Sequence, residues 1–148
     1  MFLDAFVNAT RAAQATHQQE KLAALRNAVV NSVAPDAPNV DQQARFFRLA
    51  DQFSAAHLAL LGLLDDPVGA ERAHTGRTPS APGSLGDLMD YVLSFRPSWR
   101  DLLLSDLADA RLVIDVSSPY DVLSDDGHFA RQTTALGRQF LHFISESG

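Results

Sequence analysis

The stretch "SWRDLLLSDLADARLVIDV", residues 98–116, has the outline of a short capped helix that runs into a strand. Ser98 with Asp101 has the spacing of a capping box, so we expect a helix over 99–109. The following "RLVIDV" is rich in β-branched residues and predicts a strand. Helical spacing predicts that the inward side of the helix carries Trp99, Leu102, Leu103 and Leu107.

The residues before this stretch predict a linker and one more helix. Residues 65–84 are rich in Gly, Pro, Ser and Thr, which is typical of a loop or linker. Ser84 with Asp87 again has capping-box spacing and opens a helix over 85–95. Pro97 ends that helix, because proline cannot continue a helix interior.

The residues after it predict a hairpin and a final helix. The segment "SSPYDVLSDDG" (117–127) has the Pro, Asp and Gly content of a turn, and "RQTT" (131–134) fits a short return strand. Thr134 is placed to cap the last helix. The apolar side of that helix is expected to be Leu136, Phe140, Leu141, Phe143 and Ile144.

The N-terminal part predicts two long helices. Residues 2–33 fit one helix, and Pro35 lies in the turn that ends it. Asn39 with Gln42 has capping-box spacing and opens a second helix over about 40–64, with a restart at Ser54. Its apolar residues are Val40, Phe46, Phe47, Leu49, Phe53, Leu60, Leu61 and Leu64; those of the first helix include Leu22, Leu25 and Val29.

The predicted fold is therefore mainly α. A helical hairpin over 1–64 is followed by the linker and by an α+β half over 85–148 that contains a small β-hairpin. Residues 54–64 either close the helical hairpin or form the first helix of the second half. A chain of 148 residues with 46% hydrophobic and 20% charged residues is typical of a globular protein.

Composition also limits the chemistry and the location. The absence of cysteine excludes disulfides, thiol catalysis and cysteine-based metal sites. The start "MFLDAFVNAT" lacks the basic region of a secretory signal, and the longest apolar run, 58–64, is too short to span a bilayer. We therefore expect a cytoplasmic protein without a membrane partner.

The net charge of −6 is unevenly distributed along the chain. Residues 1–83 hold seven basic and eight acidic side chains, whereas residues 84–148 hold five basic and ten acidic ones. An acidic C-terminal half repels a polyanion at long range. Nucleic acid is therefore a disfavoured partner.

The order of the predicted elements in about 54–148 resembles a winged helix-turn-helix. "LLLSDLADARLV" looks like the recognition helix and following strand of bacterial winged-helix regulators, and "TTALGRQFLHFI" looks like the segment after the wing. The resemblance implies DNA binding through the helix that matches 99–109 and through a wing matching 117–130. The wing residues of interest are Tyr120, Asp121, Asp125, Asp126 and His128.

A second resemblance covers residues 21–67. The segment "KLAALRNAVVNSVAPDAPNVDQQARFFRLADQFSAAHLALLGLLDDP" is similar to a group of uncharacterised bacterial proteins, some of them akin to abortive-infection-like phage-defence proteins. This resemblance implies a role in bacterial defence. It carries no catalytic residues over to this chain.

No pattern of residues in the sequence indicates an active site, a metal site or a cofactor site. The five histidines lack metal-ligand spacing, and His57 fits a packing or hydrogen-bonding role. The "SDDGH" segment, 124–128, fits a solvated hairpin tip better than a cation site. Asn27 and Asn31 lie four apart, so they either hydrogen-bond across a helix pair or belong to an ordinary polar face. We expect a non-enzymatic protein.

The outward side of helix 99–109 is poorly suited to DNA. Base reading needs Arg, Lys, Asn or Gln, and only Arg100 qualifies there. We predict an interaction face for protein, either a partner or a second copy in a homo-oligomer, made by Trp99, Arg100, Leu104, Ser105 and Ala108. The alternative is a DNA-binding regulator whose contacts come from Arg96, Arg100, Arg45 and Arg48.

Overall fold

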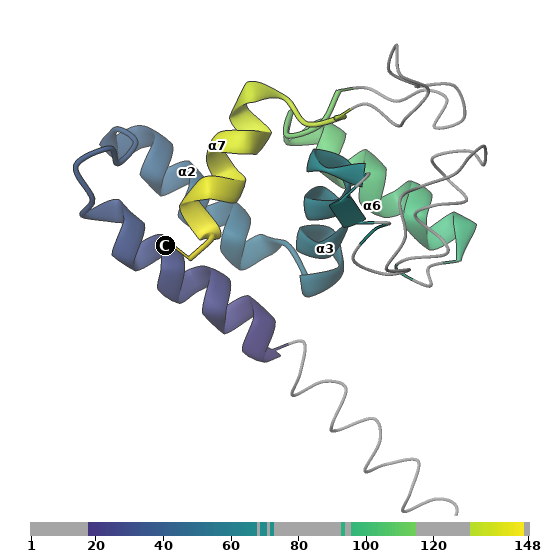
Figure 1. Ribbon diagram of the computed structural model, residues 1–148, viewed down its shortest axis with the longest axis horizontal. Helices are drawn as coiled ribbons and strands as arrows, with labels where there is room; N and C mark the ends of the chain where they lie inside the picture. The colour runs from purple at the N-terminus through teal and green to yellow at the C-terminus, as the bar shows by residue number, and fades with distance from the viewer. Residues whose placement is uncertain are drawn as a thin grey trace, which may run out of the picture. The chain divides into compact units, whose positions relative to one another are not determined.

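A computed structural model describes residues 18–67, 96–114 and 131–146, together with residues 69, 70, 72 and 93. These residues contain five helices: residues 18–32, α2 (Val40–Gln52), α3 (Ala55–Asp65), α6 (Pro97–Asp109) and α7 (Ala135–Ile144) (Figure 1). Strand pairing within the described part is one antiparallel bridge, between Val113 and Thr133. The mainly helical prediction is confirmed. The predicted wing, most of the linker and most of helix 85–95 lie outside the described residues.

The chain divides into two compact units. The first unit comprises residues 1–55 and 142–148, and the second comprises residues 56–141. The first unit thus contains the helix over 18–32, α2 and the C-terminal turn of α7. The second contains nearly all of α3, then α6 and the N-terminal part of α7.

In the first unit the helix over 18–32 and α2 run antiparallel, as Figure 1 shows. The Lys21 ammonium donates a hydrogen bond to the carbonyl of Asp51, and the Gln43 amide donates to the carbonyl of Ser32 at 3.2 Å. Asn39 caps α2, because its Oδ1 accepts the backbone N–H of Gln42 at 2.9 Å. The predicted cap is therefore confirmed.

Aromatic packing fixes the interior of the first unit. The Phe143 ring lies 5.4 Å from the ring of Phe46 and 5.3 Å from that of Phe47, the second pair in an edge-to-face arrangement. Such pairs stabilise a core by about 1 kcal/mol beyond the area they bury. The predicted apolar sides of α2 and α7 are confirmed at Phe46 and Phe143, whereas Val40, predicted on the same side of α2, is 79% exposed.

Two asparagines of the first helix hold the C-terminal end of α7. Asn31 is buried, and its Nδ2 donates to the carbonyls of Phe143 (2.8 Å), Ser145 (2.9 Å) and His142 (3.2 Å). Asn27 Nδ2 donates to the carbonyl of Ile144 at 3.1 Å. The last carbonyls of a helix have no partner within it, so these amides satisfy them from outside. Of the two interpretations left open above, hydrogen bonding between helices is the correct one.

Helix α3 starts at Ala55 directly after Ser54, as predicted. The predicted start of α6 was wrong by two residues. The helix begins at Pro97, with Arg96 in the N-cap position and no side-chain cap. Proline suits the first helical position, because its fixed φ is helical and its missing N–H would have no partner there. Ser98 therefore lies inside the helix.

The C-terminus of α6 is closed by a Schellman motif. The N–H of Leu112 donates to the carbonyl of Leu107 at 3.1 Å, and the N–H of Arg111 donates to that of Ala108 at 2.9 Å. Arg111 has a φ of 62°, in the left-handed region where this motif usually places glycine. A side chain with a Cβ costs roughly 1 kcal/mol in that conformation.

Replacing Arg111 with glycine is therefore expected to stabilise the chain by about 1 kcal/mol. The side chain is exposed, so little packing is lost. Arg111→Ala serves as the control, because it removes the same side chain but keeps the Cβ. Urea unfolding should show a higher midpoint for Arg111→Gly than for Arg111→Ala; equal midpoints would contradict the strain assigned to this residue.

The backbone on either side of the predicted wing is paired. The N–H of Ile114 donates to the carbonyl of Gln132 at 2.9 Å, and the N–H of Thr134 donates to that of Leu112 at 3.0 Å. These bonds flank the bridge between Val113 and Thr133 and give it antiparallel geometry. Within the described residues, the pairing expected between 111–116 and 131–134 is limited to this one bridge.

Thr134 caps α7, as predicted. Its Oγ1 accepts the N–H of Gly137 at 3.0 Å and donates to the carbonyl of Arg111 at 2.7 Å. Gly137 lies against the backbone of Leu112, because a Cβ added to it would stand 2.0 Å from that carbonyl oxygen. The start of α7 therefore depends on a residue without a side chain.

Candidate protein-interaction surface

The buried side of α6 differs from the predicted one. The buried residues at helical spacing along this helix and its end are Arg100, Leu103, Leu107 and Ala110. Helical spacing had placed Trp99 and Leu102 on the inward side, yet they are 46% and 50% exposed; the exposure of Trp99 agrees with its other assignment, to the interaction face. Three consecutive leucines allow either orientation by periodicity, so the spacing alone could not choose the buried side.

Arg100 was predicted to face outward, and this was wrong. Its side chain is only 4% exposed, and its Nε lies 3.3 Å from Oδ1 of the exposed Asp101. A buried guanidinium requires hydrogen-bonding partners, so this side chain belongs to the interior of the second unit. It is therefore not placed to reach a base edge or a phosphate.

The exposed side of α6 is apolar and acidic. Trp99, Leu102 and Ser105 follow one another at three-residue spacing on this side, and Asp101 and Asp109 are also exposed. Leu104 and Ala108, two further predicted interface residues, are half-buried. We call the exposed set Trp99, Leu102 and Ser105 the α6 face; Leu104, two residues after Leu102, lies on the opposite side of the helix. Large apolar side chains gathered on an exposed helix are typical of a protein interface.

A side-chain pair joins α6 to α3. His57 Nε2 lies 2.7 Å from Asp106 Oδ2, and the His57 side chain is only 12% exposed. This agrees with the hydrogen-bonding role expected for His57. Asp106 is seven residues after Trp99 and four after Leu102, so this pair joins α3 to α6 on the side of the helix that also carries these two exposed residues.

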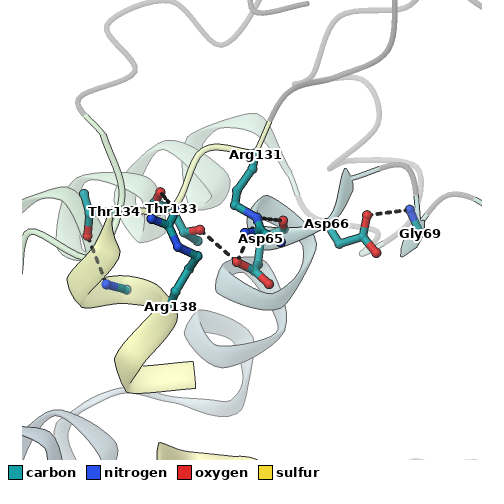
Figure 2. A network of polar contacts seen from close by, with 8 residues as sticks. Asp65, Asp66, Gly69, Arg131, Thr133, Thr134 and Arg138 are labelled. Atoms are coloured by element: carbon teal, nitrogen blue, oxygen red, sulfur yellow. Dashed lines mark hydrogen bonds and ion pairs between the residues drawn. The ribbon is translucent and has the colours of Figure 1, made fainter. Parts of the chain in front are cut away.

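A second polar network ties the C-terminal end of α3 to the segment 131–133 (Figure 2). Arg131 Nε donates to the carbonyl of Asp65 at 2.9 Å and lies 3.4 Å from its carboxylate, which accepts Thr133 Oγ1 at 2.8 Å. The carbonyl of Leu64 accepts the N–H of Gln132 at 2.8 Å. The contacts to the carbonyls of Leu64 and Asp65 satisfy the C-terminal end of α3, so the network has a structural role.

Two further contacts in Figure 2 complete the network. Arg138 Nη1 donates to the carbonyl of Thr133 at 3.0 Å, and the Asp66 carboxylate accepts the N–H of Gly69 at 3.0 Å. Within the described residues, no group of three or more acidic or histidine side chains is arranged to hold a metal ion. The acidic pair at the end of α3 therefore binds the chain's own donors.

A second apolar surface was missed by the sequence. On the first helix Leu22, Val29 and Val33 are 58%, 59% and 84% exposed, whereas Ala24 and Ala28 are buried. The sequence had identified Leu22 and Val29 only as apolar residues at helical spacing, which does not say what covers them. The missed signal was the alanine spacing, since a helix that packs closely on a neighbour places its small residues toward it.

The remaining predicted residues fall into two groups. Arg96, Arg45 and Arg48, the alternative DNA contacts, are exposed. Arg45 and Arg48 share α2 with exposed Asp41 and Asp51, so the charge of that helix surface is mixed. The predicted wing residues lie outside the described residues: Tyr120, Asp121, Asp125, Asp126 and His128.

The described part of the chain thus defines a class: a helical protein with exposed apolar helix surfaces. None of its helices is long and apolar enough to cross a membrane. In comparisons with known proteins, no family model, no curated protein and no solved structure matched the chain.

Proposed function

We propose that the chain is a non-enzymatic protein-interaction module. Its C-terminal half has the winged-helix shape, and it works in the cytoplasm as part of a bacterial regulatory or phage-defence system. The order α3, α6, paired segments and α7 supports the shape. The defence role rests on the resemblance of residues 21–67 to abortive-infection-like proteins.

One observation carries the interaction role. Among the described side chains of α6 the one cation, Arg100, is buried, while Trp99 and Leu102 are exposed beside Asp101 and Asp109. In a DNA-binding winged helix this surface contacts the major groove. There the carboxylates of Asp101 and Asp109 would repel the phosphates, and the Trp99 side chain would not read a base edge. The same surface suits a protein partner, because interface centres are rich in aromatic residues and charged groups such as Asp101 and Asp109 are accommodated at the polar rim.

The double substitution Trp99→Ser with Leu102→Gln is expected to abolish partner binding while leaving the fold intact. Both side chains are about half exposed, so unfolding stability should change by less than about 1 kcal/mol. The measurement is affinity capture from a bacterial extract with quantitative mass spectrometry. We expect at least one protein to be retained by the original chain and lost, by tenfold or more, with the double variant.

Ile114→Gln is the matched control, because Ile114 is also an exposed apolar residue of the second unit, at 45%. Captured proteins should be retained by this control variant. Equal loss with both variants would indicate general surface stickiness and contradict a specific role of the α6 face.

The alternative function is a DNA-binding regulator of the winged-helix type. The observation that favours it is the exposure of Arg96, Arg45 and Arg48. Fluorescence anisotropy against mixed-sequence duplex DNA tests it, since phosphate contacts are strongest at about 50 mM salt. Binding that weakens steeply between about 50 and 200 mM salt would favour the regulator and contradict the proposed module.

A further inference from the structure

The outward side of the first helix is an apolar stripe. We define the outer stripe as Leu22, Arg26, Val29, Val30 and Val33, which are all exposed and repeat at helical spacing. It lies opposite the side that carries Ala24, Ala28 and Asn31, which are buried. The helix therefore turns its small residues to its own unit and its large apolar residues to solvent. Val40, at the start of α2, is 79% exposed at the same end of the helical hairpin as Val33.

The size of this surface suits pairing with a copy of itself. The exposed parts of the stripe and of Val40 amount to roughly 500 Å², at the upper range of apolar patches found on monomers. Two copies would bury about 1,000 Å² together, which is close to the lower limit for a specific interface. Arg26 is the one charged side chain of the outer stripe.

We propose that this stripe pairs with the same stripe of a second copy of the chain, with the two helices antiparallel. A parallel pair places equal residues opposite each other, so two Arg26 guanidinium groups would meet inside an apolar contact. The antiparallel pair places Leu22 opposite Val33 of the second copy and Arg26 opposite its Val29, where the aliphatic stem of arginine packs well. Antiparallel helix dipoles also attract.

This inference deepens the proposed interaction function, and it rests on that function only for the non-enzymatic role of the chain. It uses the first unit, whereas the α6 face belongs to the second. Variants of the two surfaces therefore separate the two ideas. Trp99→Ser with Leu102→Gln should leave self-association unchanged, and stripe variants should leave capture of other proteins by the α6 face unchanged.

The first experiment is sedimentation equilibrium of the full chain at about 1–100 μM, a range that brackets a micromolar dissociation constant. We expect the original chain to form a reversible dimer. Val29→Asp should raise the dissociation constant of that dimer by at least tenfold. Ala44→Asp is the matched control, because Ala44 is an exposed helical residue of α2 that receives the same charge. It should dimerise like the original chain, and circular dichroism should show equal helix content in both variants.

The second experiment tests orientation and exploits the absence of cysteine. Chains carrying Leu22→Cys and Val33→Cys are oxidised separately and as an equal mixture. We expect the mixed disulfide to form at least fivefold faster than either homodimeric one. Gln52→Cys, at an exposed site of α2 away from the stripe, should cross-link slowly in every combination.

Several results would overturn the proposal. A chain that is monomeric over the whole concentration range, or a dimer that Val29→Asp leaves intact, removes the stripe as the interface. Faster cross-linking of Val33→Cys or Leu22→Cys alone than of the mixture contradicts the antiparallel arrangement. A chain that dimerises only after deletion of residues 1–17 shows that the chain's own N-terminal segment, rather than a second copy, covers the stripe.

Discussion

Replacing Gly137 with alanine is expected to destabilise the chain by about 3 kcal/mol or more, or to prevent folding of the second unit. The new Cβ would stand 2.0 Å from the carbonyl oxygen of Leu112. That oxygen is backbone and accepts the N–H of Thr134 at 3.0 Å, so it cannot move aside without breaking the bond. The start of α7 must therefore separate from the paired segments.

Gly62→Ala is the matched control for this change. Gly62 lies in α3, is exposed, and has nothing within 4 Å of an added Cβ. Alanine there should stabilise the chain by about 0.5–1 kcal/mol, because it restricts the unfolded chain and favours the helix. Urea unfolding should thus give opposite shifts for the two glycines. A Gly137→Ala midpoint within error of the original would show that α7 does not pack on Leu112 as described.

Replacing Asn31 with aspartate is expected to cost about 3–4 kcal/mol. The substitution keeps size and shape but turns a donor into a negatively charged acceptor. It would then face the carbonyls of His142, Phe143 and Ser145, which the Asn31 amide now contacts at 2.8–3.2 Å. A buried carboxylate beside the negative end of a helix has neither a partner nor a favourable dipole.

The same substitution at Asn39 provides the control. Asn39 is the N-cap of α2 and accepts the N–H of Gln42, a contact that aspartate also makes. Its charge would lie at the positive end of a helix, so Asn39→Asp should be neutral or slightly stabilising. Thermal unfolding followed by circular dichroism measures both. Equal effects at the two sites would mean that Asn31 does not hold the end of α7.

Local chemistry allowed most of the helices to be predicted from the sequence. Asn39 and Thr134 cap the helices they were expected to cap, because a short polar side chain before an apolar periodic run has few other uses. Of the predicted hairpin, the described residues contain one antiparallel bridge, between Val113 and Thr133. Ser98 failed as a cap because Pro97 competes for the same turn and prefers the first helical position.

The candidate surfaces were harder to predict. Periodicity shows that one side of a helix is apolar, but not whether its own chain or a partner covers that side. Trp99 and Leu102 were therefore placed on the inward side and Arg100 on the surface, the reverse of their positions. Only the positions of the neighbouring helices decide such cases.

The proposed function requires that this chain bind protein rather than DNA. Sedimentation velocity of the chain at about 50 μM with labelled duplex DNA in about 50 mM salt tests it most directly, because protein and DNA are followed separately and phosphate contacts are strongest there. We expect the protein to sediment as a dimer and the DNA to sediment alone. A monomeric protein that sediments together with the DNA would contradict both the proposed dimer and the proposed protein-interaction function.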